Sequence, residues 1–161
     1  MARFLREAGA EARLEELPAD TATAPDAAEA VGCELRQIVK SLVFVCDGQP
    51  VVALLPGDRR ADAAKIARAV DATQARIARA DEVVTATGFL PGSVAPFPGG
   101  ARVLVEQTLL AEPLVWAGAG STRHMVSLAP AELVRLSRGM PMDVVEEPAY
   151  HSSPDDRREP S

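Results

Sequence analysis

Residues 38–46, with the sequence IVKSLVFVC, are an apolar run that contains one lysine, Lys40, near its beginning. This density of β-branched and aromatic residues predicts a buried strand. Because alternate residues of a strand share a face, Leu42 and Phe44 lie on the same side as Lys40. An ammonium group in these surroundings is poorly placed for hydration, and burying it without a partner is costly.

Three arrangements would relieve the cost of burying Lys40. The side chain can reach water past the end of the strand, pair with a carboxylate, or bind an anionic ligand. The first arrangement implies no function, and the residues of this run leave all three open. Of the seventeen basic residues only Lys40 and Lys65 are lysines, which favours a specific role at position 40, although the base composition of the genome could produce the same bias.

The remaining pattern predicts a single α/β domain with a mixed sheet. Asp47-Gly48 is typical of a tight hairpin between two strands, and a hairpin excludes a purely parallel sheet. Hydrophobic periodicity and helix-boundary signals divide the rest of the chain. The predicted helices cover residues 2–8, 26–31, 62–70, 81–87 and 131–137, and the predicted strands cover residues 11–17, 41–46, 51–55, 102–106, 114–116 and 124–128.

We expect the domain to cover residues 1–142 and to be followed by an acidic C-terminal tail, residues 143–161, that is largely disordered. The net charge of the chain is −6; residues 143–161 hold six acidic and two basic residues and so carry −4 of it. The charge argues against DNA or any broad electrostatic contact with nucleic acid, but the nearly neutral body leaves room for a local basic patch.

No apolar run is long enough for a membrane span and the beginning lacks a secretory signal, so we expect a cytoplasmic protein without a membrane partner.

Few side chains are available for classical catalysis. The only histidines are His124 and His151, and no serine lies in a G-x-S-x-G elbow, so a catalytic triad is not expected. His124 alternates with apolar residues in a strand pattern, which favours a structural or a rim position over a catalytic one. Cys33 and Cys46 lack metal-ligand spacing, and we expect no metal and no cofactor.

Two glycine-rich segments and one aspartate complete the set of candidates. We expect residues 118–122, GAGST, to form a turn between strands, in which backbone N–H groups can converge on an anion or an oxyanion, although most such turns only connect strands. Residues 88–100, GFLPGSVAPFPGG, predict an ordered loop. Asp58, at the end of a strand, either pairs with Lys40 or caps the helix that begins near Asp62.

Taken in order, these features resemble the YbaK family of aminoacyl-tRNA editing domains, which also occurs as a domain inserted in bacterial prolyl-tRNA synthetases. The resemblance covers roughly residues 2–140. It rests on Lys40 at the head of a core strand, Gly57-Asp58 after the next strand, Thr87-Gly88-Phe89 with Gly92 and Pro96-Phe97, and Gly118-Ala119-Gly120 ahead of LAPAEL at residues 128–133.

The resemblance implies a curved, barrel-like mixed sheet flanked by helices. It implies a deacylase that hydrolyses the ester of a mischarged tRNA, typically tRNA for proline carrying cysteine or alanine, with no cofactor. Its partners would be the acceptor end of that tRNA and prolyl-tRNA synthetase. The catalytic residues that it implies are Lys40, Gly118, Ala119 and Gly120, and the substrate-binding residues are Asp58, Gly88, Phe89, Gly92, Pro96 and Ser121.

Two alternatives stay open at this point. The first is a module that binds aminoacyl-tRNA, a nucleotide or a synthetase in the same cavity without turnover. The second is an unrelated small-molecule hydrolase built around His124, which would need partner residues that the sequence does not identify.

Overall fold

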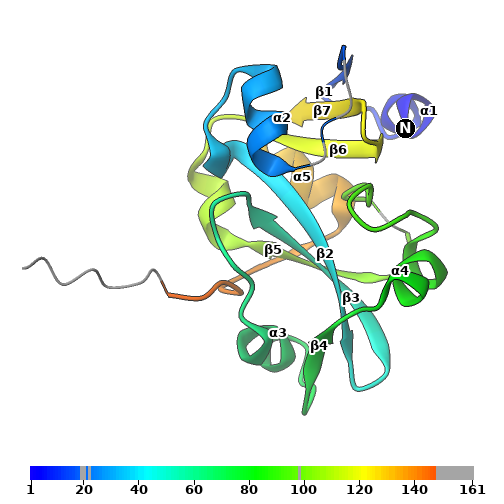
Figure 1. Ribbon diagram of the computed structural model, residues 1–161, viewed down its shortest axis with the longest axis vertical. Coiled ribbons are helices and arrows are strands. Elements are labelled where there is room, and N and C mark those ends of the chain that lie inside the picture. The colour runs from blue at the N-terminus through cyan, green and yellow to red at the C-terminus, as the bar shows by residue number, and fades with distance from the viewer. Residues whose placement is uncertain (19–20, 22, 98, 148–161) are drawn as a thin grey trace, which may run out of the picture.

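The computed structural model describes residues 1–18, 21, 23–97 and 99–147, which form one mixed sheet with helices around it (Figure 1). The strands are β1 (Ala12–Glu16), β2 (Ile38–Cys46), β3 (Gln49–Pro56), β4 (Ala75–Ile77), β5 (Arg102–Glu106), β6 (Val115–Ser121), β7 (His124–Leu128) and β8 (Met140–Met142). The α-helices are α1 (Ala2–Glu7), α2 (Ala24–Val31), α3 (Ala63–Ala69), α4 (Ala80–Thr87) and α5 (Pro130–Ser137), and two 3₁₀ turns are η1 (Leu35–Gln37) and η2 (Gln107–Ala111). The predicted α/β domain with a mixed sheet is confirmed.

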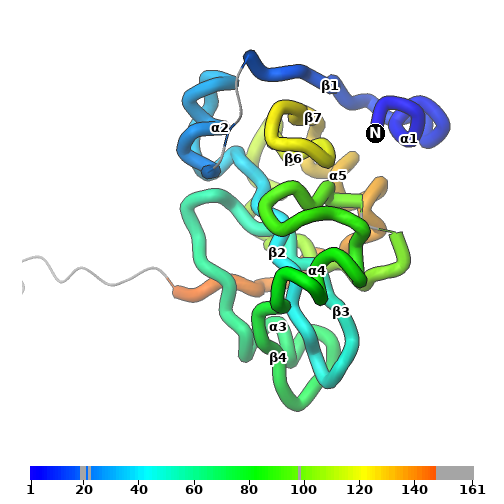
Figure 2. The backbone as a smooth tube through the Cα atoms, turned by 45° about the vertical axis from the view of Figure 1, so that its right-hand side comes forward, coloured from blue at the N-terminus to red at the C-terminus, as the bar shows by residue number. Residues whose placement is uncertain are grey.

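The strand order is β1-β7-β6-β2-β3-β5-β8, and β4 pairs with β2 outside this path. Strands β2 and β3 form the predicted antiparallel hairpin, whereas β2 runs parallel to β6 and β3 runs parallel to β5. Figure 1 shows β2 as a long strand through the middle of the molecule, and Figure 2 shows β1 at the outer edge beyond β7. The first part of β2 therefore meets one half of the sheet and its last part meets β4.

Both faces of the central hairpin are buried. Val52 and Leu54 pack in a cluster that includes Leu133 of α5, and Leu55 packs in another that includes Ile66 of α3. All five side chains are fully buried. A strand covered on both faces has an almost continuous apolar sequence, which explains the pattern that made β2 and β3 predictable.

The helix boundaries follow the capping residues. The Thr23 side chain accepts a hydrogen bond from the Asp26 N–H at 3.2 Å, and α2 ends at Gly32 in a left-handed conformation. Asp62 accepts from the N–H groups of Ala64 and Lys65 at the start of α3. The five predicted helices are present with shifts of a few residues at their ends. Strands β4 and β8, of three residues each, were not predicted because so short a segment shows no periodicity.

Residues 143–147 pack against the domain. Val144 and Val145 have exposed fractions of 0% and 2%, and Lys65 of α3 forms ion pairs with Asp143 and Glu147. The expected domain, residues 1–142, therefore omits a packed segment, since the apolar Val144 and Val145 complete the core. The rest of the predicted tail, residues 148–161, lies outside the described residues.

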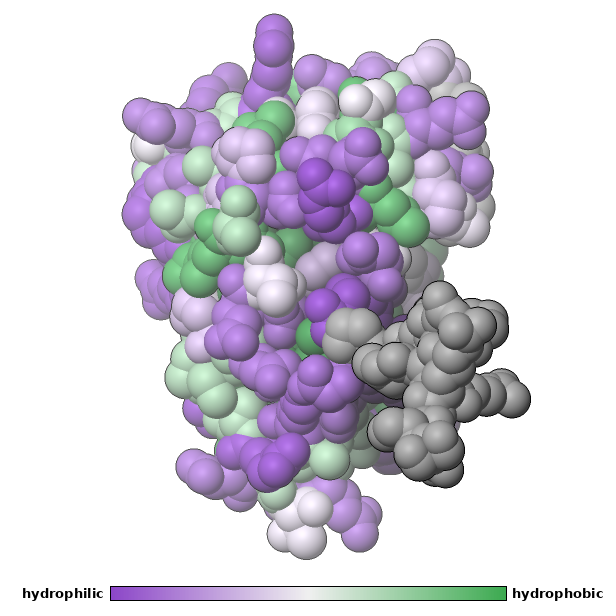
Figure 3. Space-filling model, turned by 90° about the vertical axis from the view of Figure 1, so that its left-hand side faces the viewer, coloured by the Kyte–Doolittle hydropathy of each residue, from purple (hydrophilic) through white to green (hydrophobic). Residues whose placement is uncertain are grey.

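The side of the molecule that carries α2 and this segment is largely hydrophilic, with apolar side chains in an interrupted band (Figure 3). Among the described residues, no helix combines the length and the apolar character that crossing a bilayer requires.

Asp47 and Gly48 form the hairpin turn with positive φ angles of 49° and 82°. Such angles match the twist of the flanking strands and favour Asp, Asn and Gly. The Asp47 carboxylate also accepts hydrogen bonds from the N–H groups of Thr73 at 2.8 Å and Gln74 at 3.1 Å, ahead of β4. These hydrogen bonds hold the pKa of Asp47 below its ordinary value of 3.8.

Replacing Asp47 by asparagine removes the charge and keeps a residue that tolerates the turn. Because the pKa is lowered in the folded state, the carboxylate stabilises the protein above its ordinary pKa, and this contribution is lost as the pH falls through the folded value. Urea unfolding should show Asp47→Asn to be less stable than the parent near pH 7, with a difference that shrinks as the pH is lowered below the ordinary pKa of 3.8. Asp71→Asn, at another positive φ and without a hydrogen-bonded carboxylate among the described contacts, is the control. An Asp47→Asn difference that does not change with pH would contradict this account.

Candidate functional site

A cavity of about 250 Å³ opens where the sheet is interrupted. Strand β6 pairs with β2 only at Ile38 and Val39, and β4 pairs with β2 only from Phe44 onward. Between these two pairings the edge of β2 has no strand partner, and the cavity occupies that gap. The lining residues come from α2 and the segment before it (Thr21, Thr23, Ala24, Ala27), from β2 (Ile38, Val39, Lys40, Ser41, Leu42), from the loop after α4 (Gly92, Val94) and from β6, β7 and their turn (Gly118, Ser121, Thr122, His124, Met125).

The glycines of residues 118–120 open this gap. They lie within β6, and the register of β6 against β7 shifts between Gly118 and Ser121. A bulge of this kind bends the strand, so β6 leaves β2 after Ala117. The predicted turn at residues 118–122 is therefore wrong: the strand continues to Ser121 and the reversal lies at residues 122–123, because pairing resumes between Ser121 and His124.

The open edge of β2 presents backbone groups to the cavity. Consecutive residues of a strand direct their N–H and C=O groups to opposite edges. The Ile38 carbonyl accepts from the Gly57 N–H on the β3 side, and the Val43 carbonyl accepts from the Ala78 N–H on the other side. Ser41 has the parity of Val43, so its N–H and C=O point into the gap between β6 and β4.

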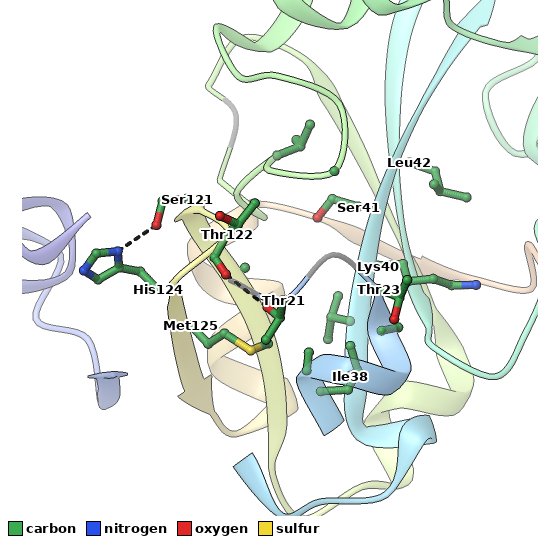
Figure 4. Close-up of a pocket in the computed structure, with 16 residues that line it drawn as sticks. Thr21, Thr23, Ile38, Lys40, Ser41, Leu42, Ser121, Thr122, His124 and Met125 are labelled. Carbon is green, nitrogen blue, oxygen red and sulfur yellow. Dashed lines mark hydrogen bonds between the residues drawn. The ribbon is translucent and has the colours of Figure 1, made fainter. Parts of the chain in front are cut away.

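Lys40 is half-buried in the wall of the cavity, and its Nζ donates a hydrogen bond of 2.7 Å to the Arg59 carbonyl. Burial lowers the pKa of Lys40 below its ordinary value; the charge of Asp58 opposes this shift and that of Arg60 adds to it. Figure 4 shows the amine directed away from the turn that bears Ser121 and Thr122. A backbone carbonyl thus holds the ammonium, a partner that the sequence did not suggest.

Asp58 lies beside Lys40 without an ion pair to it. No ion pair within 4.0 Å joins the Lys40 Nζ to the Asp58 carboxylate in the described part of the chain, and Asp58 is exposed. The alternative that Asp58 caps the next helix is wrong, since Asp62 is the cap of α3. Asp58 therefore acts on Lys40 only through its charge.

The loop after α4 contributes only part of its residues to the cavity lining, and its other residues pack beside the cavity. Gly92 and Val94 reach the lining, but Gly88 ends α4 in a left-handed conformation and Pro96 is buried in the loop. The Phe89 ring lies against Gly120, where a Cβ atom would be 3.2 Å from it. The described part of the predicted loop thus packs over the bulge through Phe89, and residue 98 of the prediction lies outside the described residues.

Ser121 and His124 form a pair at the rim. The Ser121 Oγ and the His124 Nδ1 are 2.7 Å apart, and Figure 4 shows the imidazole on the outer side of the turn, away from Lys40. No carboxylate forms a hydrogen bond or ion pair with His124 among the described residues, although Glu16 lies opposite it in β1, so the pair lacks the group that would orient a catalytic base. The same part of the chain holds no group of acids, histidines and cysteines arranged for a metal.

Several lining residues escaped the sequence analysis. Thr21 donates through both its N–H and its hydroxyl to the Thr122 carbonyl at 3.0 Å, which joins the segment before α2 to the β6–β7 turn. This contact spans a hundred residues of sequence, and no local pattern encodes it. The only sequence feature that could have identified Ser41 as a lining residue is its position directly after Lys40. Of the predicted site residues, the cavity brings together Lys40, Gly92, Gly118 and Ser121, whereas Ala119, Gly120, Gly88, Phe89, Pro96 and Asp58 lie outside its lining.

The profile of the aminoacyl-tRNA editing domain matches residues 18–136, which contain every described residue of the cavity lining. The chain belongs to this family. The resemblance predicted from Lys40 and the glycine segments is therefore confirmed. This editing domain is 31% identical over 117 residues to the proline–tRNA ligase of Coprothermobacter proteolyticus, covering 71% of this chain and 20% of the ligase.

Two further relatives match over most of their length. The editing domain is 32% identical over 125 residues to the uncharacterized protein YwhH of Bacillus subtilis, covering 76% of this chain and 79% of YwhH. A solved structure of a candidate trans-editing enzyme for prolyl-tRNA synthetase superposes with a TM-score of 0.83 and 37% identity, covering 90% of this chain and 94% of that one. The chain thus spans only a fifth of the ligase, but it covers nearly all of the solved chain of the candidate trans-editing enzyme.

Gly118 and Gly120 make a matched pair of substitutions. A Cβ atom on Gly118 meets nothing within 4 Å, whereas Gly120 has a φ of 92° and the Phe89 ring beside it. We expect Gly118→Ala to leave the free energy of unfolding nearly unchanged and Gly120→Ala to lower it by about 1–2 kcal/mol, the cost of a left-handed alanine. Chemical denaturation checks both, and equal effects would contradict the bulge geometry.

Proposed function

We propose that the protein is an aminoacyl-tRNA deacylase that hydrolyses the ester between a small amino acid and the terminal adenosine of a mischarged tRNA. One observation carries the proposal: Lys40, whose ammonium is held by a backbone carbonyl, and an unpaired edge of β2 line the same cavity. The family of the chain and its likeness to a candidate trans-editing enzyme support it. An aminoacyl ester is already activated, so positioning and electrostatic stabilisation can suffice without a nucleophilic side chain.

The cavity suits a small aminoacyl group. Ala24, Ala27 and Gly118 contribute little side-chain volume, and the hydroxyls of Thr21 and Thr23 provide polar contacts near them. No acidic side chain is among the described residues of the lining. Selection would rest on volume, and one methylene in such a pocket is worth roughly 1–3 kcal/mol.

Lys40 would hold the RNA end. An ammonium group has three N–H donors, and the Arg59 carbonyl accepts one of them. The remaining donors can bind a phosphate or a hydroxyl oxygen of the terminal nucleotide. The fixed carbonyl keeps the ammonium in place before the substrate arrives, which limits the entropy lost on binding.

The hydrolytic step needs only groups that the cavity and the substrate supply. The oxygen of a water molecule attacks the ester carbonyl carbon, and the charge that develops on the carbonyl oxygen can be stabilised by a backbone donor such as the Ser41 N–H. The bond between that carbon and the ribose oxygen then breaks. The ribose oxygen takes a proton from the water, with the neighbouring ribose hydroxyl as the relay.

The tRNA for proline and prolyl-tRNA synthetase are the partners that we propose. The net charge of −6 favours contact limited to the acceptor end over extended wrapping of the tRNA. The ligase relatives carry their matching domain within the same chain as a synthetase, so a separate domain would act beside one.

Lys40→Met removes the charge and keeps an apolar stem against β2. We expect the variant to fold and to lose at least about ten-fold in deacylation, because a hydrogen bond to a charged group contributes roughly 1.5–3 kcal/mol. The measurement is the loss of labelled alanine, cysteine or serine from charged tRNA, with circular dichroism to verify folding. Arg68→Ala, which removes an exposed charge from α3, is the control. Deacylation by Lys40→Met at the parent rate would remove Lys40 from the mechanism.

The same assay separates the two alternatives. Binding of charged tRNA with an unchanged ester lifetime would favour a module without turnover. Ser121→Ala or His124→Ala should retain most of the activity, because the pair lacks an orienting acid. Loss of nearly all activity in both variants would instead favour a serine nucleophile activated by His124.

Gly118→Ala should change selectivity while the fold is kept. The added methyl enters the cavity without touching protein atoms, so it competes with the aminoacyl side chain. We expect deacylation of the larger esters to fall relative to that of alanine by about ten-fold, the lower end of what one methylene is worth. The ratio of rates for alanyl and cysteinyl tRNA measures this, and an unchanged ratio would place the aminoacyl group elsewhere.

A further inference from the structure

Residues 143–147, which we call the C-terminal strap, bind the loop that follows β3. The Glu146 N–H donates to the Arg60 carbonyl at 2.8 Å, and the Asp62 N–H donates to the Val144 carbonyl at 2.9 Å. Between these bonds, Ala61 and Val145 form an antiparallel bridge. Figures 1 and 2 both show the strap, in orange, crossing this loop.

Side chains add to the contact between the strap and the loop. The Arg59 guanidinium donates from Nη2 to the Glu146 carbonyl at 2.8 Å. Lys65, at the start of α3, donates to Asp143, to Glu147 and to the Val145 carbonyl. The strap is therefore held at several points along its length.

The core anchors the strap from the other side. Val144 and Val145 are buried, and the Val144 N–H donates at 3.2 Å to Oε1 of Glu106, a carboxylate with an exposed fraction of 0%. Oε2 of Glu106 accepts from the Thr108 N–H at 2.7 Å, so this carboxylate is itself fixed. The strap thus links a rigid part of the sheet to the loop after β3.

The loop that the strap holds is the one that holds Lys40. The Arg59 carbonyl accepts the hydrogen bond from Lys40, while the Arg59 side chain and the next residue, Arg60, contact Glu146. Loop backbones without such ties are mobile, and a mobile carbonyl fixes an ammonium poorly.

We propose that the strap, through Arg59, positions the Lys40 ammonium at the cavity. Arg59 is a positioning residue, since its guanidinium is bound to the strap and only its carbonyl reaches Lys40. The effect on activity rests on the proposed function, whereas the effect on the lysine does not. Residues 143–147 are in this account part of the working domain.

Because the chain contains only two lysines, NMR can follow the mobility of the Lys40 side chain directly. In protein labelled with ¹³C- and ¹⁵N-lysine, NMR of the ε-methylene and ζ-ammonium groups reports on Lys40 and Lys65 alone. We expect Arg59→Ala to give Lys40 the averaged shifts and fast relaxation of a free side chain. Lys65, whose partners are unchanged, should keep its parent signals and so serves as the internal reference.

Two shortened chains make a matched pair. Ending the chain after Val145 removes both Glu146 contacts and the ion pair between Glu147 and Lys65 but keeps the buried valines, so the Lys65 signals also change in this chain. Ending it after Glu147 keeps every strap contact described. Only the first should mobilise Lys40 and slow deacylation, by about five-fold or more, the value of one hydrogen bond. The slowing should appear in kcat for charged tRNA, and thermal unfolding verifies that each chain is folded. If the chain ending at Val145 does not fold, the lysine spectra of Arg59→Ala alone test the inference.

Lys40 signals that stay at their parent positions in Arg59→Ala would overturn the inference, whatever the activity shows. A parent protein that deacylates no charged tRNA would overturn the proposed function, while the lysine spectra would still test the strap. Arg68→Ala, at an exposed arginine of α3 with no hydrogen bond or ion pair to the strap among the described contacts, should leave both the spectra and the rates unchanged.

Discussion

The hydrogen bond from Lys40 to the Arg59 carbonyl is the contact on which the site depends. It holds the ammonium of half-buried Lys40, and among the described residues that line the cavity no other is a lysine, arginine, aspartate or glutamate. Removing an ammonium from water is costly, and a carbonyl at 2.7 Å offsets part of that cost while leaving donors for a ligand. An anionic or strongly polar ligand would complete the solvation of the group.

The cavity exists because two constraints act on one strand. The β2–β3 hairpin keeps one edge of β2 fully paired, and the bulge in β6 takes away the partner of its other edge beyond Val39. Ser41 is left with backbone groups that point into open space. The sheet thus supplies fixed backbone donors and acceptors, which cost no reorganisation when charge develops in a reaction.

The sequence predicted the features that depend on local patterns. The Asp47-Gly48 hairpin, the five helices and the embedded Lys40 each have a signal within a few residues, although the cap of α3 is Asp62 and not the predicted Asp58. The features that depend on contacts between distant residues were missed or wrongly predicted. The glycines at 118 and 120 suit a turn as well as a bulge, and only the pairing of Ser121 with His124 distinguishes the two.

The partner of Lys40 illustrates the same limit. A sequence shows side chains, so a carboxylate such as Asp58 is an obvious candidate, whereas a carbonyl is present at every residue and has no signature. The position of the Arg59 carbonyl depends on contacts with residues 143–147, some ninety positions away. The family resemblance predicted one site from Lys40 and the glycine segments. The fold brings Lys40, Gly92 and Gly118 to one cavity and leaves Gly88, Ala119 and Gly120 outside its lining.

A crystal structure with a non-hydrolysable substrate analogue tests the account most directly. Adenosine that carries alanine through an amide at the ribose 3′ position preserves the shape of the ester and resists hydrolysis. The account predicts that its alanyl group lies between Ser41 of β2 and Gly118 of β6, with the Lys40 Nζ within hydrogen-bond distance of the nucleoside. An analogue bound elsewhere, or bound here with Lys40 turned away from it, would contradict the account.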